Sequence, residues 1–437
     1  MEGEVHGFGR LQPALLAAVL SLGSPAADPL ETKARAFREA LLERHLSREG
    51  LVLYRIDLRT IEADLERGTY PDLADGPTFT GLLAAGACGR ASFESGEARA
   101  EALADADRAL SGLELLMAVT GRRGLLARSV RRAPPPDGAP PRKKWLNGAP
   151  GYEDFSFRAN VSMDQYANGL LPAVGLCAEH FPERTRALIV AAAEHLLRNR
   201  MRLVDPDGEQ TRFGDLSPGS GFGFNSLAKL TGYGVFALSA ALDPDPRWAE
   251  QRDRLRDESR VVARAKRTNL RVLGITNHSN DLMAWNLYRV LVPLARRTGD
   301  SALADLRGGM ERTWRRVRDD GNAYFALVHC SLEPEACSEE RLAEVRALLD
   351  AFPLEKRKLA PPDELARVPK RLLPGRKWVR LARNPVPIEL RPVSSFEWKS
   401  SPYRLRRSVA PDVEYTGLDF LVAYWLYREV TGLGAPQ

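Results

Sequence analysis

The sequence predicts an all-α protein whose helices form a closed α/α toroid. The alternative is an open-ended superhelix of helix pairs. Helical periodicity dominates the 437 residues, and the alternation typical of strands is scarce. The predicted helices come in consecutive pairs of similar length. One member of several pairs is rich in Gly, Ala and Ser, which suits a crowded inner ring, and the other carries many charges, which suits a solvated outer ring.

About eleven segments have helical periodicity, and long loops rich in Pro, Gly or Arg separate some of them. The predicted helices are Glu31–His45, Thr78–Phe93, Ala98–Thr120, Asp164–His180, Glu183–Leu203, Asn225–Leu242, Arg247–Ala265, Asn280–Arg297, Ser301–Val317, Ser338–Ala351 and Gly417–Val430. The long loops are Pro134–Pro150, Asp205–Phe224 and Phe352–Pro411. Loops of this length in a compact domain are usually functional, so we expect them to form lids or binding loops.

Composition indicates an ordinary globular protein, with 44% hydrophobic and 27% charged residues. Because closed helical barrels of this size form one domain, we predict a single domain over residues 28–437. The net charge of +6 is a small difference between 63 basic and 57 acidic residues. Basic residues gather at Arg128–Arg132, Arg142–Lys144 and Arg367–Arg383. No nucleic-acid motif accompanies them, so a solvated loop surface is the favoured interpretation and no nucleic-acid partner is predicted.

The N-terminal 27 residues are expected to be a signal peptide or a disordered segment. Leu11–Leu22 is apolar and Ser24–Ala27 offers small residues for cleavage, although Glu2 and Glu4 make a poor n-region. We therefore favour a periplasmic or secreted protein, with a cytoplasmic one as the alternative. No other apolar run is long enough to span a bilayer.

The four cysteines indicate neither a metal site nor a redox motif. Cys88 and Cys177 lie in small-residue helical patterns and are expected to be buried core thiols. Cys330 and Cys337 flank a predicted loop and could form a local disulfide in an exported protein. No metal and no cofactor is predicted. The turn Asp205–Gly208 lacks the later ligands of a calcium loop, so a tight turn is favoured.

Two polar segments, each directly before an apolar helix, indicate the functional site. Ile275–Trp285 holds Asn277, His278, Asn280 and Asp281, which is more than helix capping requires. Phe157–Asn168 has the same design, with Ser162, Asp164, Gln165 and Tyr166. In a toroid, such clusters at the starts of inner helices converge on one mouth. The clusters are Thr78–Thr80, Ser162–Tyr166, Phe224–Asn225, Asn277–Asp281 and Glu414–Asp419.

Position in a first helical turn suggests a chemical role for each carboxyl group. A helix N-terminus lowers a carboxyl pKa, so Asp164 and Asp281 are expected to be ionised bases or nucleophiles. A general acid needs a carboxyl group whose pKa is raised by burial, and the candidates for this role are Glu397 and Asp419. Glu397 could instead only pair with a loop arginine, and Asp419 could only cap its helix. Nearby aromatic residues suit sugar stacking, namely Tyr166, Trp285, Trp398, Tyr403 and Tyr415, whereas Trp425 is assigned to the core.

Several segments resemble six-hairpin glycosidase-like proteins, an (α/α)6-barrel superfamily, and in particular an uncharacterised bacterial branch. They are Thr80–Leu82, Ser162–Tyr166, Asp205–Pro218, Asn277–Asp281 and Tyr415–Trp425. The resemblance implies an (α/α)6 toroid with long loops at the barrel mouth. It also implies a carbohydrate substrate, since the superfamily includes glycoside hydrolases, polysaccharide lyases and sugar epimerases. No catalytic pair carries over from this branch.

Three functional hypotheses follow, each with an oligosaccharide or polysaccharide as the partner. Glycoside hydrolysis with paired carboxylates is preferred, with Asp164 and Asp281 as the pair to test first. β-Elimination on a uronate-containing glycan would use Asn277 and His278 to neutralise the substrate carboxylate, with Tyr166 or Tyr415 moving protons. A non-catalytic binding toroid is the third. The predicted catalytic residues are Asp164, Asp281, His278 and Glu397, and the predicted substrate-binding residues are Gln165, Tyr166, Asn277, Asn280, Trp285, Trp398, Tyr415 and Asp419.

Overall fold

The computed structural model describes most of the chain after its N-terminal segment. The described residues are 28–70, 73–136, 144–219, 226–265, 277–360, 362–373, 376–405 and 408–432. The predicted signal peptide or disordered segment, residues 1–27, therefore lies outside the described residues, as does the predicted cluster Phe224–Asn225.

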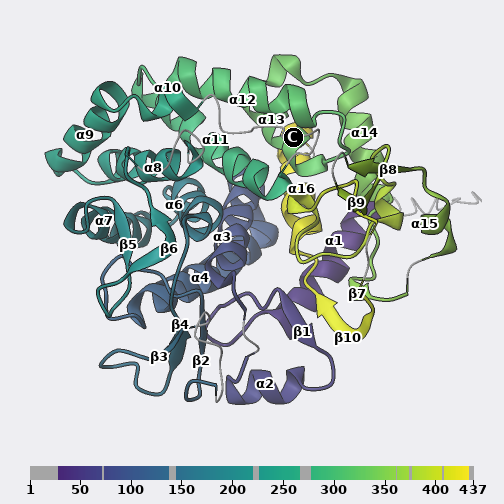
Figure 1. The fold of residues 1–437 in the computed structure, drawn as a ribbon, viewed down its shortest axis with the longest axis horizontal. Coiled ribbons are helices and arrows are strands. Elements are labelled where there is room, and N and C mark those ends of the chain that lie inside the picture. The colour runs from purple at the N-terminus through teal and green to yellow at the C-terminus, as the bar shows by residue number, and fades with distance from the viewer. Residues whose placement is uncertain are drawn as a thin grey trace, which may run out of the picture.

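Six helical segments within the described residues form an inner ring (Figure 1). They are α3 (Gly76–Phe93), the continuous run α5–η3–α6 (Met163–Gln165, Tyr166–Leu170 and Leu171–Cys177), α8 (Ser226–Leu242), α11 (His278–Thr298), α13 (Ala323–Leu332) and α16 (Leu418–Thr431). Each packs against the next along the chain, and α16 packs against α3. The ring is therefore closed, which rules out the open superhelix.

An outer ring covers the inner one, also in six segments of the described chain. These are α4 (Gly96–Ala118), α7 (Pro182–Arg198), α9–η4–α10 (Pro246–Asp253, Arg254–Glu258 and Val261–Ala265), α12 (Leu303–Val317), α14 (Glu339–Asp350) and α1–η1 (Pro29–Ala40 and Leu41–His45). Five pack on the inner helix that precedes them, and α1 packs on α16. The protein is an (α/α)6 toroid, and its first and last helices close the ring.

Glycine at the inner crossings explains why small residues mark the inner ring. A Cβ atom on Gly81 of α3 would lie 2.3 Å from the carbonyl oxygen of Gly169 in η3. A Cβ atom on Gly169 would lie 2.2 Å from the carbonyl oxygen of Pro77. The two backbones are therefore in direct contact, and a side chain at either position would force the helices apart.

The inner helix α13 is not among the helices predicted from the sequence. Nearly every side chain of α13 is buried, as in α3 and α8, but α13 has only 10 residues, whereas those two helices have 18 and 17. Its N-terminus is fixed by Asn322, whose Oδ1 accepts a hydrogen bond from the backbone N–H of Phe325 at 3.1 Å. With α14 it forms the hairpin that completes the toroid.

Two other predicted helices differ from the structure because the backbone turns sharply. The predicted helix Glu183–Leu203 ends at Arg198, and Arg200 and Met201 follow with φ of 53° and 67°. The predicted helix Arg247–Ala265 is interrupted at Arg260, where φ is 49°. A positive φ is incompatible with a right-handed helix, so each helix must stop there.

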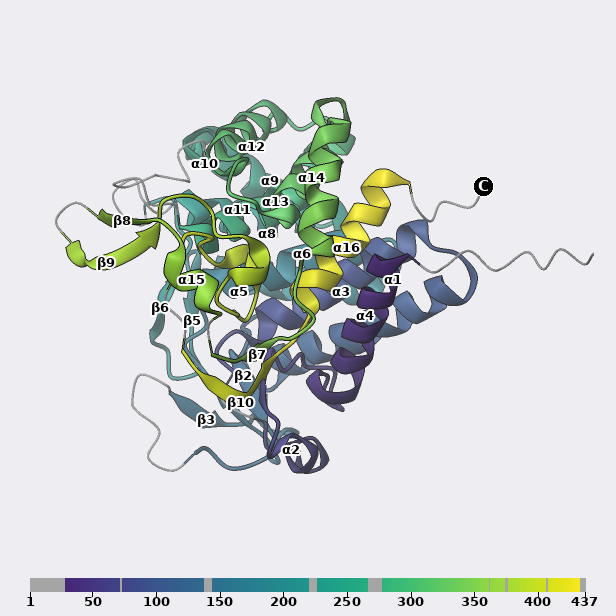
Figure 2. The same cartoon turned by 90° about the vertical axis from the view of Figure 1, so that its right-hand side faces the viewer.

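Short antiparallel strands lie in the loops that lead to the inner helices. They are β1 (Arg55–Asp57), β2 (Ser129–Arg131), β3 (Trp145–Asn147), β4 (Ser156–Arg158), β5 (Arg202–Val204), β6 (Gln210–Asp215), β7 (Arg357–Lys358), β8 (Lys370–Leu373), β9 (Arg376–Ala382) and β10 (Ala410–Tyr415). They form the sheets β1-β10-β7, β2-β4-β3, β5-β6 and β8-β9. Figure 2 shows them on one side of the molecule, with α2 (Ile61–Arg67) and α15 (Asp363–Arg367). The mouth is on this side, because each of these loops enters an inner helix at its N-terminus.

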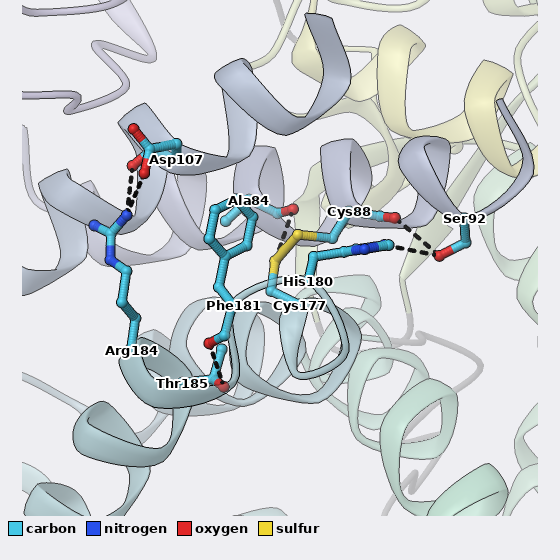
Figure 3. Close-up of a disulfide and its surroundings, with 9 residues drawn as sticks. All are labelled: Ala84, Cys88, Ser92, Asp107, Cys177, His180, Phe181, Arg184 and Thr185. Carbon is cyan, nitrogen blue, oxygen red and sulfur yellow. Dashed lines mark hydrogen bonds and ion pairs between the residues drawn. A yellow bond between two sulfur atoms is a disulfide. The ribbon is translucent and has the colours of Figure 1, made fainter. Parts of the chain in front are cut away.

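Two disulfides join cysteines of the described chain. Cys330 and Cys337 form a local disulfide, the alternative that the sequence left open. Cys88 and Cys177 form a second one that ties α3 to α6 (Figure 3). The prediction that these two are free core thiols is therefore wrong. They are 89 residues apart in the sequence, and only the packing of α3 on α6 brings them together.

Candidate functional site

The first polar cluster at the mouth is a pair of carboxyl groups on neighbouring inner helices, Asp75 and Asp164, which we call the carboxylate pair. Asp75 directly precedes α3, and Asp164 lies in the first turn of α5. The side-chain nitrogen of Gln165 lies 3.2 Å from Asp75 Oδ1 and 3.5 Å from Asp164 Oδ2. These two oxygens are therefore at most about 7 Å apart, which is below the upper limit of about 9.5 Å between the carboxyl groups of glycosidases.

The two members of the pair have different surroundings. Asp75 contacts two cations, Lys399 Nζ at 3.3 Å and Arg128 Nη2 at 3.5 Å, and its side chain is 24% exposed. Asp164 is hydrogen-bonded by the hydroxyl of Ser162, the residue that caps α5. No cation bonds to Asp164 among the described residues. One carboxyl thus has the partners of an anion, and the other has neutral partners.

Burial raises the pKa of Asp164 above its ordinary value, and the nearby Asp75 raises it further. The hydrogen bond from Ser162 offsets this only in part. The expectation that the start of the helix lowers this pKa is therefore wrong. Removing the carboxylate from water outweighs the helix N-terminus, so Asp164 is suited to hold a proton.

A second polar cluster, the α11 cluster, consists of His278, Asp281, Asp320 and Tyr403. Asp320 Oδ2 lies 2.9 Å from His278 Nε2, and Asp320 Oδ1 accepts a hydrogen bond of 2.6 Å from the hydroxyl of Tyr403. Asp281, one turn into α11, is only 1% exposed. Its Oδ2 and the Nδ1 of His278 are buried without a hydrogen-bond partner among the described residues.

Burial raises the pKa of Asp281 to about 7, and Asp320 adds to the rise. His278 and Arg316 oppose it. Here too the expected low pKa is wrong, for the same reason as at Asp164. Asp281 lies in the first turn of an inner helix, as the sequence predicted, but its side chain is buried and does not face solvent.

The segment from Phe396 to Tyr403 links the two clusters across the mouth. Lys399 reaches Asp75, and Tyr403 reaches Asp320. Lys399 and Tyr403 are four residues apart, a backbone span of no more than about 14 Å, so one short segment joins the carboxylate pair to the α11 cluster. The starts of α3 and α5 therefore meet directly, and the start of α11 is joined to them through this segment.

Glu397 and Asp419 anchor this segment. Glu397 is buried and bonds to Arg391 at 3.2 Å, and burial raises its pKa against the effect of Arg391. Asp419 is buried and accepts hydrogen bonds from Lys356 Nζ at 2.7 Å and from the backbone N–H of Glu397 at 2.8 Å. The contact of Glu397 matches its structural alternative, a partner arginine. Asp419 does not cap α16, whose N-cap is Gly417, and instead binds Lys356 and the backbone of Glu397.

The other predicted binding residues divide into two groups. Tyr166, Trp285 and Trp398 have no exposed surface, and Trp285 packs among aromatic rings of α12 and α13. Asn277 caps α11 and is exposed, and Asn280 is partly exposed. Tyr415 lines a cavity next to α1 instead of the carboxylate pair. Of the predicted residues, Asp164 and Gln165 are the ones brought together with Asp75.

Sequence reasoning did not single out Asp75, Arg128, Lys399 or Asp320 as site residues. A signal existed for Asp75, which precedes Gly76 and Pro77 at the start of an inner helix, as a capping residue does. Arg128 was assigned to a solvated basic loop, but its side chain points to the mouth and bonds to the carbonyl oxygens of Ala74 and Asn160. Lys399 and Asp320 carry no local signal, because only the fold places them here.

Metal ligands are not assembled in the part of the chain that the structure describes. There, no group of three or more His, Cys, Asp or Glu side chains is arranged to hold a metal ion. The acidic turn at Asp205 and Asp207 surrounds the ammonium group of Lys144. Among the described helices, none is long and apolar enough to cross a membrane.

Comparisons with known proteins add little to this description. No protein-family model matches the chain, and no curated protein matches it. Among solved structures, a Zn-binding triple mutant of the GH family 9 endoglucanase J30 is similar, with 14% sequence identity and a TM-score of 0.40. The match covers 80% of this chain and 71% of that chain. The toroid is defined by the contacts among this chain's own helices.

Proposed function

We propose that this protein is a carbohydrate-active hydrolase that cleaves glycosidic bonds at the mouth of the toroid. The observation that carries the proposal is the carboxylate pair. Two carboxyl groups lie within about 7 Å in opposite environments, one with cations and one with neutral partners. Glycoside hydrolysis needs this combination of a proton donor and a carboxylate.

In this proposal Asp164 is the general acid, because burial favours its protonated form. It would protonate the oxygen of the leaving sugar. Asp75 would act as the base that activates water or as the nucleophile, with Lys399 and Arg128 stabilising its negative charge. Gln165 touches both carboxyl groups and would hold them in register.

The remaining predicted catalytic residues have supporting roles in this proposal. Asp281 and His278 lie behind the mouth surface, in the α11 cluster. Glu397 fixes the segment that carries Lys399. The two tyrosines predicted for β-elimination lie elsewhere, because Tyr166 is bonded to the carbonyl oxygen of Gly124 and Tyr415 lines another cavity. Tyr403 is joined to His278 through Asp320, but His278 in that cluster is buried. Hydrolysis therefore remains the preferred reaction.

The test is an activity screen of the purified full chain on neutral and uronate-containing oligosaccharides, reading both reducing ends and unsaturated products. Asp164→Asn and Asp75→Asn are expected to lower kcat/KM by about a hundredfold to ten-thousandfold. Asp154→Asn is the control, because its carboxylate is 83% exposed on a mouth loop. New reducing ends that both site variants lose would support the hydrolase.

Three outcomes would contradict the proposal. Unsaturated products would indicate a lyase, in which His278 would help to neutralise the substrate carboxylate. Activity that survives in both Asn variants would remove the carboxylate pair from the mechanism. Sugar binding without turnover, unchanged in the two variants, would support the non-catalytic toroid.

We also propose that the protein works in an oxidising compartment, as a periplasmic or secreted protein. The two disulfides support this, because such bonds persist outside the reducing cytoplasm. Protein isolated under thiol-blocking conditions should show no alkylated cysteine before reduction and four after it. Alkylation of Cys88 or Cys177 before reduction would contradict the proposal.

A further inference from the structure

A cavity lies away from the carboxylate pair, where the first and last helices close the ring. Its volume is about 530 Å³, within the range of about 300 to 1,000 Å³ typical of small-molecule sites. Its walls come from α1 and η1, from residues 354–357, and from the end of β10 through Gly417. In Figure 1, α1, β7 and β10 lie side by side at the edge of the toroid. Neither Asp75 nor Asp164 lines this cavity.

The polar floor of the cavity centres on His45 and Glu414. His45 ends the π-helical turn Leu41–His45, a distortion that is frequent at functional sites. Its ring is 1% exposed, with Nδ1 at 2.6 Å from the carbonyl oxygen of Leu53 and Nε2 at 3.0 Å from Glu414 Oε1. Arg44 Nη2 bonds to the same Glu414 oxygen at 3.0 Å.

Hydrogen-bonding capacity remains at this floor. Arg44 Nε is buried and has no hydrogen-bond partner among the described residues. Burial alone would raise the pKa of Glu414, but His45 and Arg44 lower it, so the carboxylate is an acceptor. Both contacts use Oε1, and Oε2 is the oxygen through which Glu414 would accept from a ligand. A donor and an acceptor are therefore side by side.

The charges around the cavity are balanced, which indicates the class of ligand. Lys356 is bonded to Asp419 at 2.7 Å, Arg357 to Glu355 at 2.7 Å, and Arg44 to Glu414. Each cation that lines the cavity already has a carboxylate partner, so none is left over for an anion. Hydroxyl groups both donate and accept, which suits a wall where donors and acceptors alternate. Tyr415, Phe37 and Leu58 add apolar surface for a sugar ring.

We infer that this cavity binds a neutral mono- or disaccharide, at a site separate from the carboxylate pair. Glu414 and Arg44 hold neighbouring hydroxyl groups, and the apolar wall contacts the ring. The inference does not depend on hydrolysis at the mouth, because none of these residues contacts Asp164 or Asp75.

The experiment measures binding to the full chain by saturation-transfer NMR. The neutral probes are glucose, galactose, xylose, maltose and cellobiose, and the charged probes are glucuronate and inorganic sulfate. Ala40→Trp fills the cavity from α1, and Thr32→Trp is the matched control on an exposed position of the same helix. Glu414→Gln removes the acceptor charge without changing its shape. Asp164→Asn reports on the mouth.

At least one neutral sugar should bind to the natural protein and to Thr32→Trp and Asp164→Asn with equal affinity. The binding that persists in Asp164→Asn should be absent when Ala40→Trp is added to it, and Glu414→Gln should weaken that binding about tenfold or more. Failure of every neutral sugar, preference for glucuronate or sulfate, or unchanged binding in Glu414→Gln would overturn the inference. If Ala40→Trp does not fold, the binding affinity of Glu414→Gln is the deciding measurement. Loss of binding in Asp164→Asn alone would place the sugar at the mouth and overturn it too.

Discussion

The carboxylate pair and the α11 cluster have the same design but different environments. Each places a carboxyl group in the first turn of an inner helix, Asp164 in α5 and Asp281 in α11. Asp164 lies at a partly exposed position beside Asp75, which has two cationic partners. Asp281 is buried beside His278 and Asp320. One arrangement can meet a substrate, and the other is part of the protein interior.

The comparison shows which electrostatic effect is larger at these helix starts. A helix N-terminus stabilises a carboxylate by about 0.3 to 1 kcal/mol when it is exposed. Burying the charge costs several kcal/mol. The pKa values of Asp164 and Asp281 are therefore both raised, although their position in the helix favours the opposite. Burial decides the protonation state, and accessibility decides the function.

The largest predicted effect on stability is the pH dependence caused by Asp281. Its pKa is about 7 in the folded protein and about 3.9 when unfolded, so the folded state holds the extra proton between these values. The contribution of Asp281 to the free energy of unfolding is therefore largest below about pH 4. It falls by about 4 kcal/mol as the pH rises from about 4 to about 7. Asp281→Asn should remove this fall. Urea unfolding at about pH 5 and about pH 8 tests it, with Asp154→Asn as the control, and parallel curves for Asp281→Asn and the natural protein would contradict it.

The next effect concerns Asp320, which accepts from Tyr403 and contacts His278 inside the α11 cluster. Asp320→Ala leaves the buried His278 and the partly buried hydroxyl of Tyr403 without this acceptor, so the free energy of unfolding should fall by about 3 kcal/mol. The neighbouring Asp319 is 79% exposed, and Asp319→Ala should change the free energy of unfolding by less than about 0.5 kcal/mol. Equal effects of the two variants in chemical denaturation would show that the cluster is not a buried network.

A smaller effect is expected for the hydroxyl of Tyr403. Tyr403→Phe removes one hydrogen bond of 2.6 Å to Asp320 and should lower the free energy of unfolding by about 1 kcal/mol. Tyr152→Phe, on a mouth loop where the ring packs against Phe155, serves as the control. Thermal unfolding compares the stabilities of the two variants. Equal stabilities would show that the hydroxyl of Tyr403 does not stabilise the α11 cluster.

The smallest effect on stability is predicted for the residue with the largest proposed effect on activity. Burial disfavours the charged form of Asp164, so the neutral Asn of similar size should change the free energy of unfolding by no more than about 0.5 kcal/mol. The same Asp164→Asn protein should lose hydrolytic activity. If Asp164→Asn unfolds much more easily than the natural protein, Asp164 is a structural residue like Asp281.

The sequence predicted part of the site and missed the rest for a physical reason. Ser162, Asp164 and Gln165 are consecutive or nearly so, and their capping pattern is visible in the sequence. Lys399 is 324 residues from Asp75, and Asp320 is 83 residues from Tyr403. No local pattern encodes contacts over such distances. The protonation of Asp164 and Asp281 was predicted incorrectly because the burial of a side chain is a property of the complete fold.

The sequence by itself determined the class of fold, because helical periodicity, small residues at helix crossings and charged outer helices are local features. It could not reveal α13, since a short run of mostly apolar residues can form either a buried strand or a buried helix. The tertiary structure decided which polar residues meet, which cysteines pair and which carboxyl groups keep a proton. These outcomes depend on desolvation and on contacts between distant segments, and both exist only after the ring has closed.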